Sequence, residues 1–115
     1  MTKSRVLLYL YGYSPRKKEE LEEFYKILEY QLKNNVKINL VFIQDGVIAI
    51  NQKNLKNESL DKILMINNSQ ISFYGIKQDL IARGLGNISH DFIKVIDYED
   101  LVEIMENSDN IISWI

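Results

Sequence analysis

Two apolar runs, residues 6–11 and 36–43, are separated by a segment with helical periodicity, and this order constrains the fold more than any other feature of the sequence. Each run has the length and composition of a buried strand. Between them, apolar side chains recur every three or four residues on one face of a predicted helix: Leu21, Phe24, Tyr25, Leu28 and Leu32. A helix of this length fills the crossover between parallel strands, so we expect the two runs to pair in parallel.

Residues around these segments mark where the predicted helix begins and ends. Gly12 ends the first apolar run, and Ser14 follows as a predicted N-cap, because its hydroxyl can accept a hydrogen bond from a free N–H of the first turn. Pro15 suits the first helical position, where no backbone donor is needed. We therefore predict a helix that starts at Pro15 and ends before Asn34 and Asn35.

The rest of the chain continues the alternation of strands and helices. Asp45 and Gly46 mark a turn into a short helix, residues 51–58 form a polar surface loop, and Gly84 stops a helix that begins near Lys77. Other segments have the apolar pattern of helices (60–64, 98–105) or of strands (71–74, 94–96, 111–114). The alternation predicts the α/β class, as a three-layer α/β/α sandwich around a central, mainly parallel sheet of about five strands.

Length, charge and cysteine content exclude several classes of function. At 115 residues the chain is expected to be a single domain, residues 1–115. Its 14 basic and 16 acidic side chains give a net charge of −2, which argues against direct binding of nucleic acid. No apolar run is long enough to cross a bilayer, and the amino terminus has no cleavage site, so we expect a soluble, cytoplasmic protein. Without cysteine, and with His90 as the lone histidine, we expect no disulfide, metal site or thiol nucleophile.

Functional groups of an open α/β sheet gather beyond the carboxyl ends of its strands. In this sequence, four turns leave those ends: residues 12–15, 44–46, 74–77 and 97–98. We therefore look for a binding crevice or a docking surface in these turns. Each turn also has a purely structural interpretation.

The second turn and the Arg83-Gly84 pair show how the two interpretations compare. Gln44 and Asp45 supply an amide and a carboxylate that can hold a partner's loop or polarise a small substrate. The favoured interpretation is that Asp45 caps the next helix while Gly46 permits the turn. Arg83 and Gly84 fit a helix end, because a cation offsets the negative end of the helix dipole and glycine reaches the left-handed conformation cheaply.

The acidic and aromatic candidates can be interpreted in the same two ways. Asp79 lies near a helix start, where a carboxylate suits the dipole, and an interface role for it is the weaker interpretation. Asp97 fits an N-cap, and Tyr98 follows it as the first residue of the last helix. Large amphipathic side chains near strand ends favour interface use of at least some of them: Tyr9, Tyr11, Tyr13, Tyr74 and Trp114.

Several strings occur in a recognisable order and spacing: Gln44-Asp45-Gly46-Val47, Asp79-Leu80-Ile81-Ala82-Arg83-Gly84-Leu85, Ile88-Ser89, Ile96-Asp97-Tyr98 and Trp114. From about Leu8 to Trp114, this set resembles the TusB/DsrH branch of the DsrE/DsrF/DsrH-like sulfur-relay proteins. The resemblance implies a DsrEFH-like fold with flavodoxin-like layering, no catalytic residue and no cofactor. It also implies DsrE/DsrF-like or TusC/TusD-like partners, and a role in tRNA wobble uridine 2-thiolation or in sulfur oxidation.

The resemblance also draws attention to Ile76. In the sulfur-carrying sister proteins of the TusD and DsrE type, the acceptor cysteine lies near the start of a helix that ends in a similar Arg-Gly pair. Counting back from Arg83-Gly84 leads to Ile76, where isoleucine offers only packing. The chain is therefore expected to be a non-catalytic structural subunit. Its candidate interface or crevice residues are Ser14, Gln44, Asp45, Gly46, Tyr74, Ile76, Asp79, Arg83, Gly84, Asp97, Tyr98 and Trp114.

Two other functions compete with the subunit hypothesis. The first alternative is a self-associating small-molecule or nucleotide-binding domain of flavodoxin-like character, with its ligand in a crevice beside Asp45. No glycine-rich dinucleotide fingerprint or Walker-type loop supports it. A hydrolase or transferase based on Asp45 and His90 ranks last. The chain made alone is expected to form a homo-oligomer, because a surface built for sister subunits of like fold can pair with itself.

Overall fold

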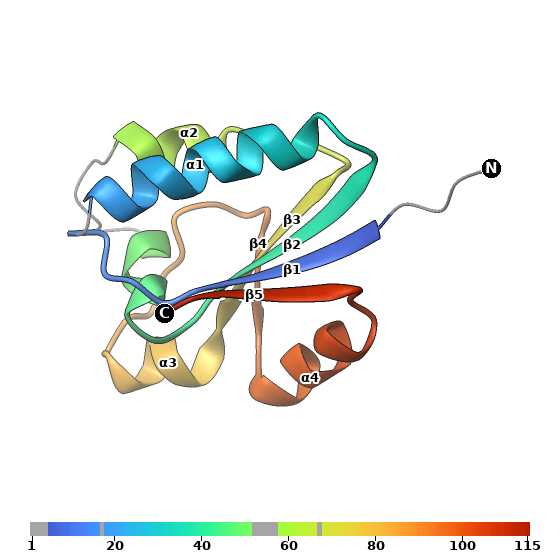
Figure 1. The fold of residues 1–115 in the computed structure, drawn as a ribbon. Coiled ribbons are helices and arrows are strands. Elements are labelled where there is room, and N and C mark those ends of the chain that lie inside the picture. The colour runs from blue at the N-terminus through green and yellow to red at the C-terminus, as the bar shows by residue number, and fades with distance from the viewer. Residues whose placement is uncertain (1–4, 17, 52–57, 67) are drawn as a thin grey trace.

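Strands alternate with helices along the residues that the computed structural model describes, which are 5–16, 18–51, 58–66 and 68–115 (Figure 1). The elements are β1 (Arg5–Tyr11), α1 (Lys18–Leu32), β2 (Val36–Phe42), η1 (Gln44–Ile50), α2 (Glu58–Leu64), β3 (Ile71–Ile76), α3 (Lys77–Ala82), β4 (Ile93–Ile96), α4 (Tyr98–Glu106) and β5 (Asn110–Trp114). Among them η1 is a 3-10 helix. Each segment that the sequence predicted as a strand or helix corresponds to one of these elements.

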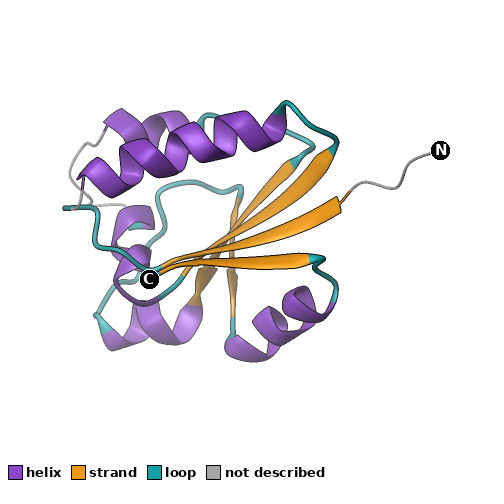
Figure 2. Cartoon of the chain, viewed as in Figure 1, coloured by secondary structure: helices purple, strands orange, loops and turns teal. Residues whose placement is uncertain are grey.

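The strands form one parallel sheet in the order β4-β3-β2-β1-β5. Helices α1 and α2 lie on one side of this sheet, and α3 and α4 lie on the other (Figure 1, Figure 2). The predicted three-layer sandwich with a central parallel sheet is therefore confirmed. The parallel crossover inferred from the two apolar runs is also confirmed, since β1 and β2 pair in register with Tyr9 beside Leu40.

Apolar side chains fill the space on both faces of the sheet. On the α1 side, Phe24 is fully buried, and its ring centroid lies 4.8 Å from that of Tyr11 and 5.5 Å from that of Tyr9. On the α4 side, a second cluster includes Ile76 and Leu101. Tyr9 and Tyr11 are thus core residues, because alternation along β1 turns both rings toward α1. The expectation of interface use for at least some of the aromatic candidates then concerns Tyr13, Tyr74 and Trp114.

The first helix begins later than the sequence predicted. α1 starts at Lys18, and Ser14 instead belongs to a preceding turn, where its Oγ accepts a hydrogen bond of 3.3 Å from the Arg16 N–H. The predicted N-cap at Ser14 is therefore wrong. A later start is favourable because the first helical turn then contains Glu19 and Glu20, whose negative charges suit the positive end of the helix dipole.

The later elements agree more closely with the sequence patterns. Asp97 caps α4 as predicted: its carboxylate accepts a 2.8 Å hydrogen bond from the Asp100 N–H, and the Asp100 carboxylate accepts one of 3.2 Å from the Asp97 N–H. The predicted surface loop over residues 51–58 lies outside the described residues except at its two ends. Among the described helices, none combines the length and the apolar composition that a membrane span requires.

Candidate interaction site at the carboxyl ends of the strands

Asp79 connects three segments at the carboxyl end of the sheet. It lies in the first turn of α3, and its Oδ2 accepts a 2.8 Å hydrogen bond from the Gln44 N–H of η1. The same oxygen accepts a 2.7 Å hydrogen bond from the Tyr98 hydroxyl at the start of α4. Hydrogen bonds to an ionised carboxylate are among the stronger ones in proteins. Asp79 therefore joins the turns that follow β2, β3 and β4.

Arg83 extends this network to Asp45. Its Nε and Nη2 both lie 3.0 Å from Asp45 Oδ1, and its Nη1 donates to the Asp79 backbone carbonyl at 3.2 Å. The Asp45 side chain is 58% exposed, whereas that of Asp79 is 14% exposed. An exposed ion pair of this kind contributes only about 0–1 kcal/mol to stability. A partner can therefore contact these charges with little loss of stability of the folded chain.

The favoured interpretation of Asp45 as a helix cap is wrong. The N-cap of η1 is Ile43, and no side-chain hydrogen bond caps this helix. Asp45 instead points to Arg83, which lies 38 residues later in the chain. The parallel sheet places β2 beside β3, so the segments that follow these two strands meet at one end of the sheet. This long-range ion pair takes the place of the local cap.

The turn from β2 into η1 has unusual backbone geometry. Gln44 has φ of 53°, in the left-handed region that non-glycine residues rarely adopt. The sequence analysis assigned Gly46 to the turn itself, but the structure gives another reason for a glycine here. A Cβ at this position would lie 2.0 Å from the Tyr11 carbonyl oxygen. Close approach of two backbone segments therefore accounts for this glycine. Together these features hold the Gln44 N–H against Asp79.

Tyr98 has a raised pKa at this site. Burial, the hydrogen bond to Asp79 and the negative charge of Asp79 raise the pKa of Tyr98 to about 12, and the Arg83 charge acts in the opposite direction. The phenol is therefore protonated at neutral pH and remains a hydrogen-bond donor. This property makes Tyr98 a structural link between α4 and α3.

The raised pKa predicts how Tyr98→Phe changes stability. At pH 7 the variant should lose about 1 kcal/mol, the typical contribution of one hydrogen bond. As the pH rises from 10 toward 12, the wild type should lose stability, because the phenol ionises first in the unfolded chain. The Tyr98→Phe protein should lose less over this interval. Urea unfolding at pH 7 and pH 11 measures both effects.

The matched control is a second Tyr→Phe variant, so that both variants have the same number of tyrosines. Tyr30→Phe removes an exposed hydroxyl from α1, on the opposite side of the sheet. It should leave the unfolding free energy at pH 7 within about 0.5 kcal/mol of the wild type. The same pH dependence in the wild type and in Tyr98→Phe would contradict the hydrogen-bonded role of Tyr98.

The other predicted site residues lie away from this network. Ile76 is fully buried in the apolar cluster that includes Leu101 of α4, and Tyr74 lies two residues earlier on the same face of β3. Trp114 is on the edge strand β5, with its ring centroid 5.2 Å from that of Phe24 on the α1 side. Gly84 ends α3 with φ of 66°, as predicted. The structure thus brings together Gln44, Asp45, Asp79, Arg83 and Tyr98.

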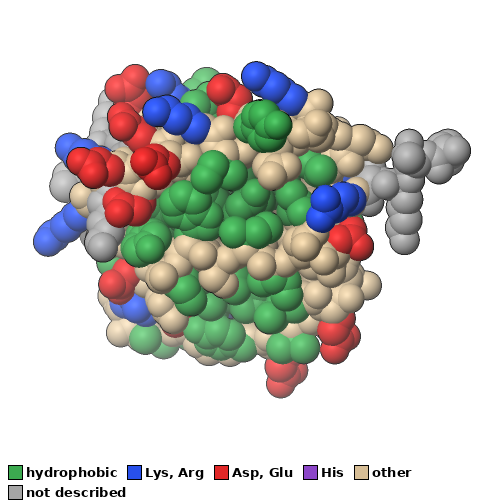
Figure 3. Space-filling model, in the orientation of Figure 1, with side chains coloured by type: hydrophobic (Ala, Val, Ile, Leu, Met, Phe, Trp, Pro, Cys, Tyr) green, Lys and Arg blue, Asp and Glu red, His purple; other side chains and the backbone are tan. Residues whose placement is uncertain are grey.

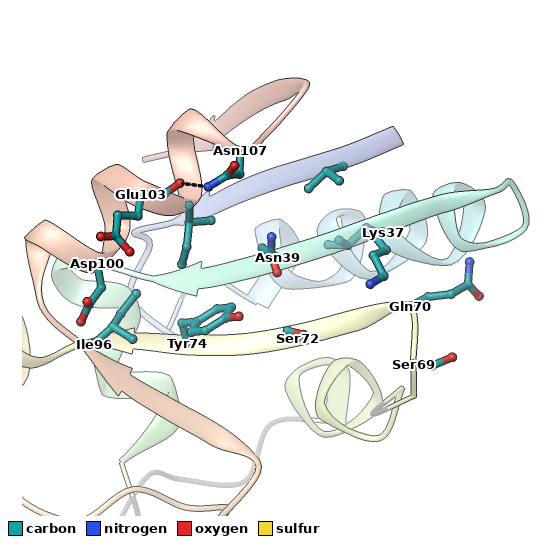
Figure 4. A pocket seen from close by; sticks show the side chains of 13 residues that line it. Lys37, Asn39, Ser69, Gln70, Ser72, Tyr74, Ile96, Asp100, Glu103 and Asn107 are labelled. Atoms are coloured by element: carbon teal, nitrogen blue, oxygen red, sulfur yellow. Dashed lines mark hydrogen bonds between the residues drawn. The ribbon is translucent and has the colours of Figure 1, made fainter. Parts of the chain in front are cut away.

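A polar groove that the sequence analysis did not predict lies on the α4 side of the sheet (Figure 4). Its volume is about 650 Å³, and its floor includes Lys37 and Asn39 of β2 and Ser72 and Tyr74 of β3. Asp100 and Glu103 of α4 and its C-cap residue Asn107 line the wall. A signal was present in the sequence, because polar residues alternate with apolar ones in the segments that form β2 and β3.

Comparison with known proteins agrees with the features above. A family model described as "DsrH like protein" matches residues 13–111, which is most of the chain. This chain belongs to the TusB/DsrH family. The TusB/DsrH chain is 41% identical over 76 residues to "Protein TusB" of Escherichia coli strain K12, across 65% of this chain and 73% of that protein. "Protein TusB" of E. coli O1:K1 / APEC has the same identity and coverage.

Solved structures extend the comparison of the TusB/DsrH chain at the level of fold. The crystal structure of the ychN protein from E. coli superposes with a TM-score of 0.71 at 16% identity, covering 96% of this chain and 99% of the other. A protein of unknown function, MTH1491 from Methanobacterium thermoautotrophicum, has a TM-score of 0.67 at 16% identity and the same coverage. These similarities confirm the α/β sandwich. Family membership identifies the chain as a sulfur-relay component.

Proposed function

We propose that this chain is a cytoplasmic, non-catalytic structural subunit of a DsrEFH- or TusBCD-like complex. In this role it supports persulfide transfer by cysteine-bearing DsrE/DsrF-like or TusC/TusD-like partners. The observation that carries the proposal is the absence of cysteine from a member of a sulfur-relay family. A persulfide is built on a thiol sulfur, so the chemistry must take place on another chain. The downstream reaction is tRNA wobble uridine 2-thiolation or sulfur oxidation.

The environment of Ile76 supports the proposal. By resemblance, this position corresponds to the acceptor cysteine of the sulfur-carrying sister proteins. Here the side chain is fully buried, and it belongs to the same apolar cluster as Leu8, Val41 and Leu101. A residue in such surroundings packs the layers together and meets neither solvent nor a partner's thiol.

Burial of Ile76 predicts that restoring a thiol does not restore a sulfur acceptor. In Ile76→Cys, the new thiol should react with a thiol reagent such as DTNB only at the rate at which the protein unfolds, because burial raises a thiol's pKa and blocks access. Ile81→Cys places a thiol on the exposed side of α3, the helix that follows Ile76, where the native side chain is 65% exposed, and should react at once. Rapid reaction of native Ile76→Cys would contradict this account.

The proposed docking surface for the partners is the hydrogen-bonded network of Gln44, Asp45, Asp79, Arg83 and Tyr98. Asp45 and Arg83 carry accessible charges, and Asp79 fixes the turns on which they lie. Charged groups at the rim of an interface direct association and specificity more than they add affinity. Partner contacts at this edge would also lie close to the carboxyl ends of the strands, where functional groups of such sheets gather.

Co-purification with partners tests the proposal directly. The chain should be isolated with DsrE/DsrF-like proteins from its own source, and adding it to them should change the rate of transfer of labelled sulfur. Asp45→Asn should weaken the complex, whereas Glu58→Gln should not. Glu58 is the matched control, because it is an exposed acid in an ion pair with Lys62 on the opposite layer. A chain that is always isolated alone and never affects transfer would contradict the proposal.

Gene deletion separates the two possible pathways. Loss of 2-thiolated wobble uridine in tRNA from a deletion strain would assign the chain to tRNA modification. Normal thiolation with impaired sulfur oxidation would assign it to the oxidative pathway. Neither defect in the deletion strain would contradict both assignments.

Small-molecule binding is the second candidate function. The sequence analysis placed its ligand beside Asp45, whereas the polar groove that favours it is not lined by Asp45. The groove's volume of about 650 Å³ lies within the range of ligand sites. A thermal-shift screen with nucleotides and flavins tests it, because a ligand that binds only the folded chain raises its stability by mass action. The subunit hypothesis expects no shift from these compounds. A shift that Tyr74→Ala removes would instead favour the ligand-binding function.

A further inference from the structure

Two interior strands of the sheet carry polar side chains on the α4 side. Lys37 and Asn39 of β2 and Ser72 and Tyr74 of β3 form the floor of the groove (Figure 4), and none of the four is buried. The interior strands of a parallel sheet are normally covered on both faces and apolar throughout. Packing within the chain therefore does not explain this polar floor.

The polar groups of the groove have no partner among the residues that the structure describes. The side chains of the four floor residues make neither a hydrogen bond nor an ion pair with any of those residues. On the facing wall, the Glu103 carboxylate is also unpaired, although the Glu103 backbone carbonyl accepts a 2.8 Å hydrogen bond from the Asn107 amide. Unpaired donors and acceptors that face one groove are available to a ligand.

Charge is distributed unevenly along the groove. Lys37 is the second residue of β2 and lies toward one end, whereas Asp100 is in the first turn of α4 and lies toward the other, beyond Tyr74 (Figure 4). Among the described residues that line the groove, Lys37 is the one base, and Asp100 and Glu103 are the acids. Because Tyr74 pairs with Val41, four residues after Lys37, the positive and negative ends are about 13 Å apart.

Glu103 does not contribute to the stability of α4 through the helix dipole. It lies in the last turn of that helix, where the partial negative charge of the helix end favours a cation. α4 contains four acids and no lysine or arginine, and acidic side chains mark the surface over this helix (Figure 3). A cation bound in the groove would offset this excess of negative charge.

We propose that the groove binds an extended segment of another protein in which an arginine and an acidic residue are four positions apart. The arginine guanidinium lies over the Tyr74 ring and donates to the carboxylates of Asp100 and Glu103. Arginine suits this end because its flat cation stacks on aromatic rings and its donors match carboxylates. The acidic side chain of the segment pairs with Lys37 at the other end.

The spacing of four positions follows from the geometry of the floor. An extended chain rises about 3.3 Å per residue, so four steps cover the distance between the two ends of the groove. Every second side chain of such a chain points to the same side, so the first, third and fifth residues face the floor. The third lies over Asn39 and Ser72, which are paired in the sheet, and a small polar residue suits that position.

The charges of the groove favour such a segment over a nucleotide. The two carboxylates on the wall would repel a phosphate, and Lys37 is the single base among the described lining residues. The inference goes beyond the proposed function, because neither Asp45 nor Arg83 of the proposed docking surface lines the groove. The groove is therefore a second, separate contact surface.

Two peptides of equal composition test the spacing. Acetyl-Arg-Gly-Ser-Gly-Glu-amide should shift the backbone amide NMR signals of Asn39, Ser72 and Glu103 in the isotope-labelled chain. Acetyl-Gly-Arg-Glu-Ser-Gly-amide has the same charges side by side, cannot reach both ends, and should bind about tenfold more weakly or worse. Free arginine tests a small-molecule ligand instead. Equal binding of the two peptides, binding of free arginine as tight as that of the first peptide, or no shift at the peptide's solubility limit would overturn the proposal.

Charge-removing variants of α4 separate binding from stability. Glu103→Gln should weaken binding of the first peptide by about tenfold or more, without lowering the free energy of unfolding, because it removes a charge that opposes the helix dipole. Glu106→Gln is the matched control: it removes an exposed acid from the same last turn, and Glu106 does not line the groove. It should leave binding unchanged. An equal loss of binding in both variants would contradict the assigned role of Glu103.

A double-mutant cycle assigns the other end of the peptide. Lys37→Gln should weaken binding of the first peptide by about tenfold, and replacing the peptide's glutamate by glutamine should weaken binding to the wild type by the same factor. The two changes together should cost no more than either alone, because they remove one ion pair. Fully additive losses would overturn the pairing of Lys37 with the acidic residue. These measurements contain no sulfur-relay partner, so their failure leaves the proposed function unaffected.

Discussion

Gly46→Ala is expected to destabilise the protein by about 3 kcal/mol, at the upper end of the usual penalty for overpacking. An added Cβ would lie 2.0 Å from the Tyr11 carbonyl oxygen. That oxygen cannot move away easily, because it accepts a 3.0 Å hydrogen bond from the Ile43 N–H between β1 and the segment after β2. Urea unfolding should show a lower midpoint with an unchanged slope.

Two other glycines serve as controls for Gly46→Ala. At Gly75 a Cβ would meet the terminal methyl of Ile50 at 2.3 Å, and a side-chain end can shift, so Gly75→Ala should cost about 1 kcal/mol. At Gly86 no atom lies within 4 Å, and Gly86→Ala should change stability by about 0.5 kcal/mol or less. A Gly46→Ala protein as stable as Gly86→Ala would contradict the close contact between η1 and the end of β1.

Phe24→Ala is expected to have the largest effect of any single core substitution considered, a loss of about 4 kcal/mol. Phe24 is fully buried on α1, and its ring packs against Tyr9, Tyr11 and Trp114. Removing it leaves a cavity between α1 and the sheet. Because a domain of this kind is stable by about 5–15 kcal/mol in total, the variant should unfold at a much lower urea concentration.

Fluorescence of the single tryptophan gives a local readout of the same substitution. Trp114 lies 5.2 Å from Phe24 between ring centroids, so Phe24→Ala should move its emission to longer wavelength as water approaches the indole. Phe24→Leu keeps most of the volume and should cost about 1.5 kcal/mol or less. Emission and stability unchanged in Phe24→Ala would contradict the position of Phe24 as the contact between α1 and β5.

Most of the fold could be predicted because its signals are local. Apolar runs and helical periodicity located the strands and helices, and the N-cap at Asp97 and the glycine at Gly84 marked two helix ends correctly. The start of α1 was missed, since Ser14 and Pro15 suit a helix start and also suit a turn. The dipole preference for Glu19 over Arg16 in the first turn decides between these possibilities.

The candidate site was predictable only in its location. Because the carboxyl ends of parallel strands share one edge, Gln44, Asp45 and Tyr98 could be assigned to the same region. Their contacts could not be assigned: Asp45 was interpreted as a cap, whereas it pairs with Arg83. The role of Asp79 as acceptor from both Gln44 and Tyr98 depends on side-chain directions that periodicity does not encode.

The sequence by itself determined the α/β class, the order of the elements, membership of the TusB/DsrH family and the absence of a thiol. Each of these depends on residue identity or on spacing within a few turns of the chain. Tertiary structure alone decided that Asp79 joins three turns, that polar residues of β2 and β3 line a groove, and that Arg5 donates a hydrogen bond to Asn110 of β5. These features follow from strand order and register, which bring residues 19 to 105 positions apart into contact. Such contacts are set by packing of the whole chain, and local preference cannot specify them.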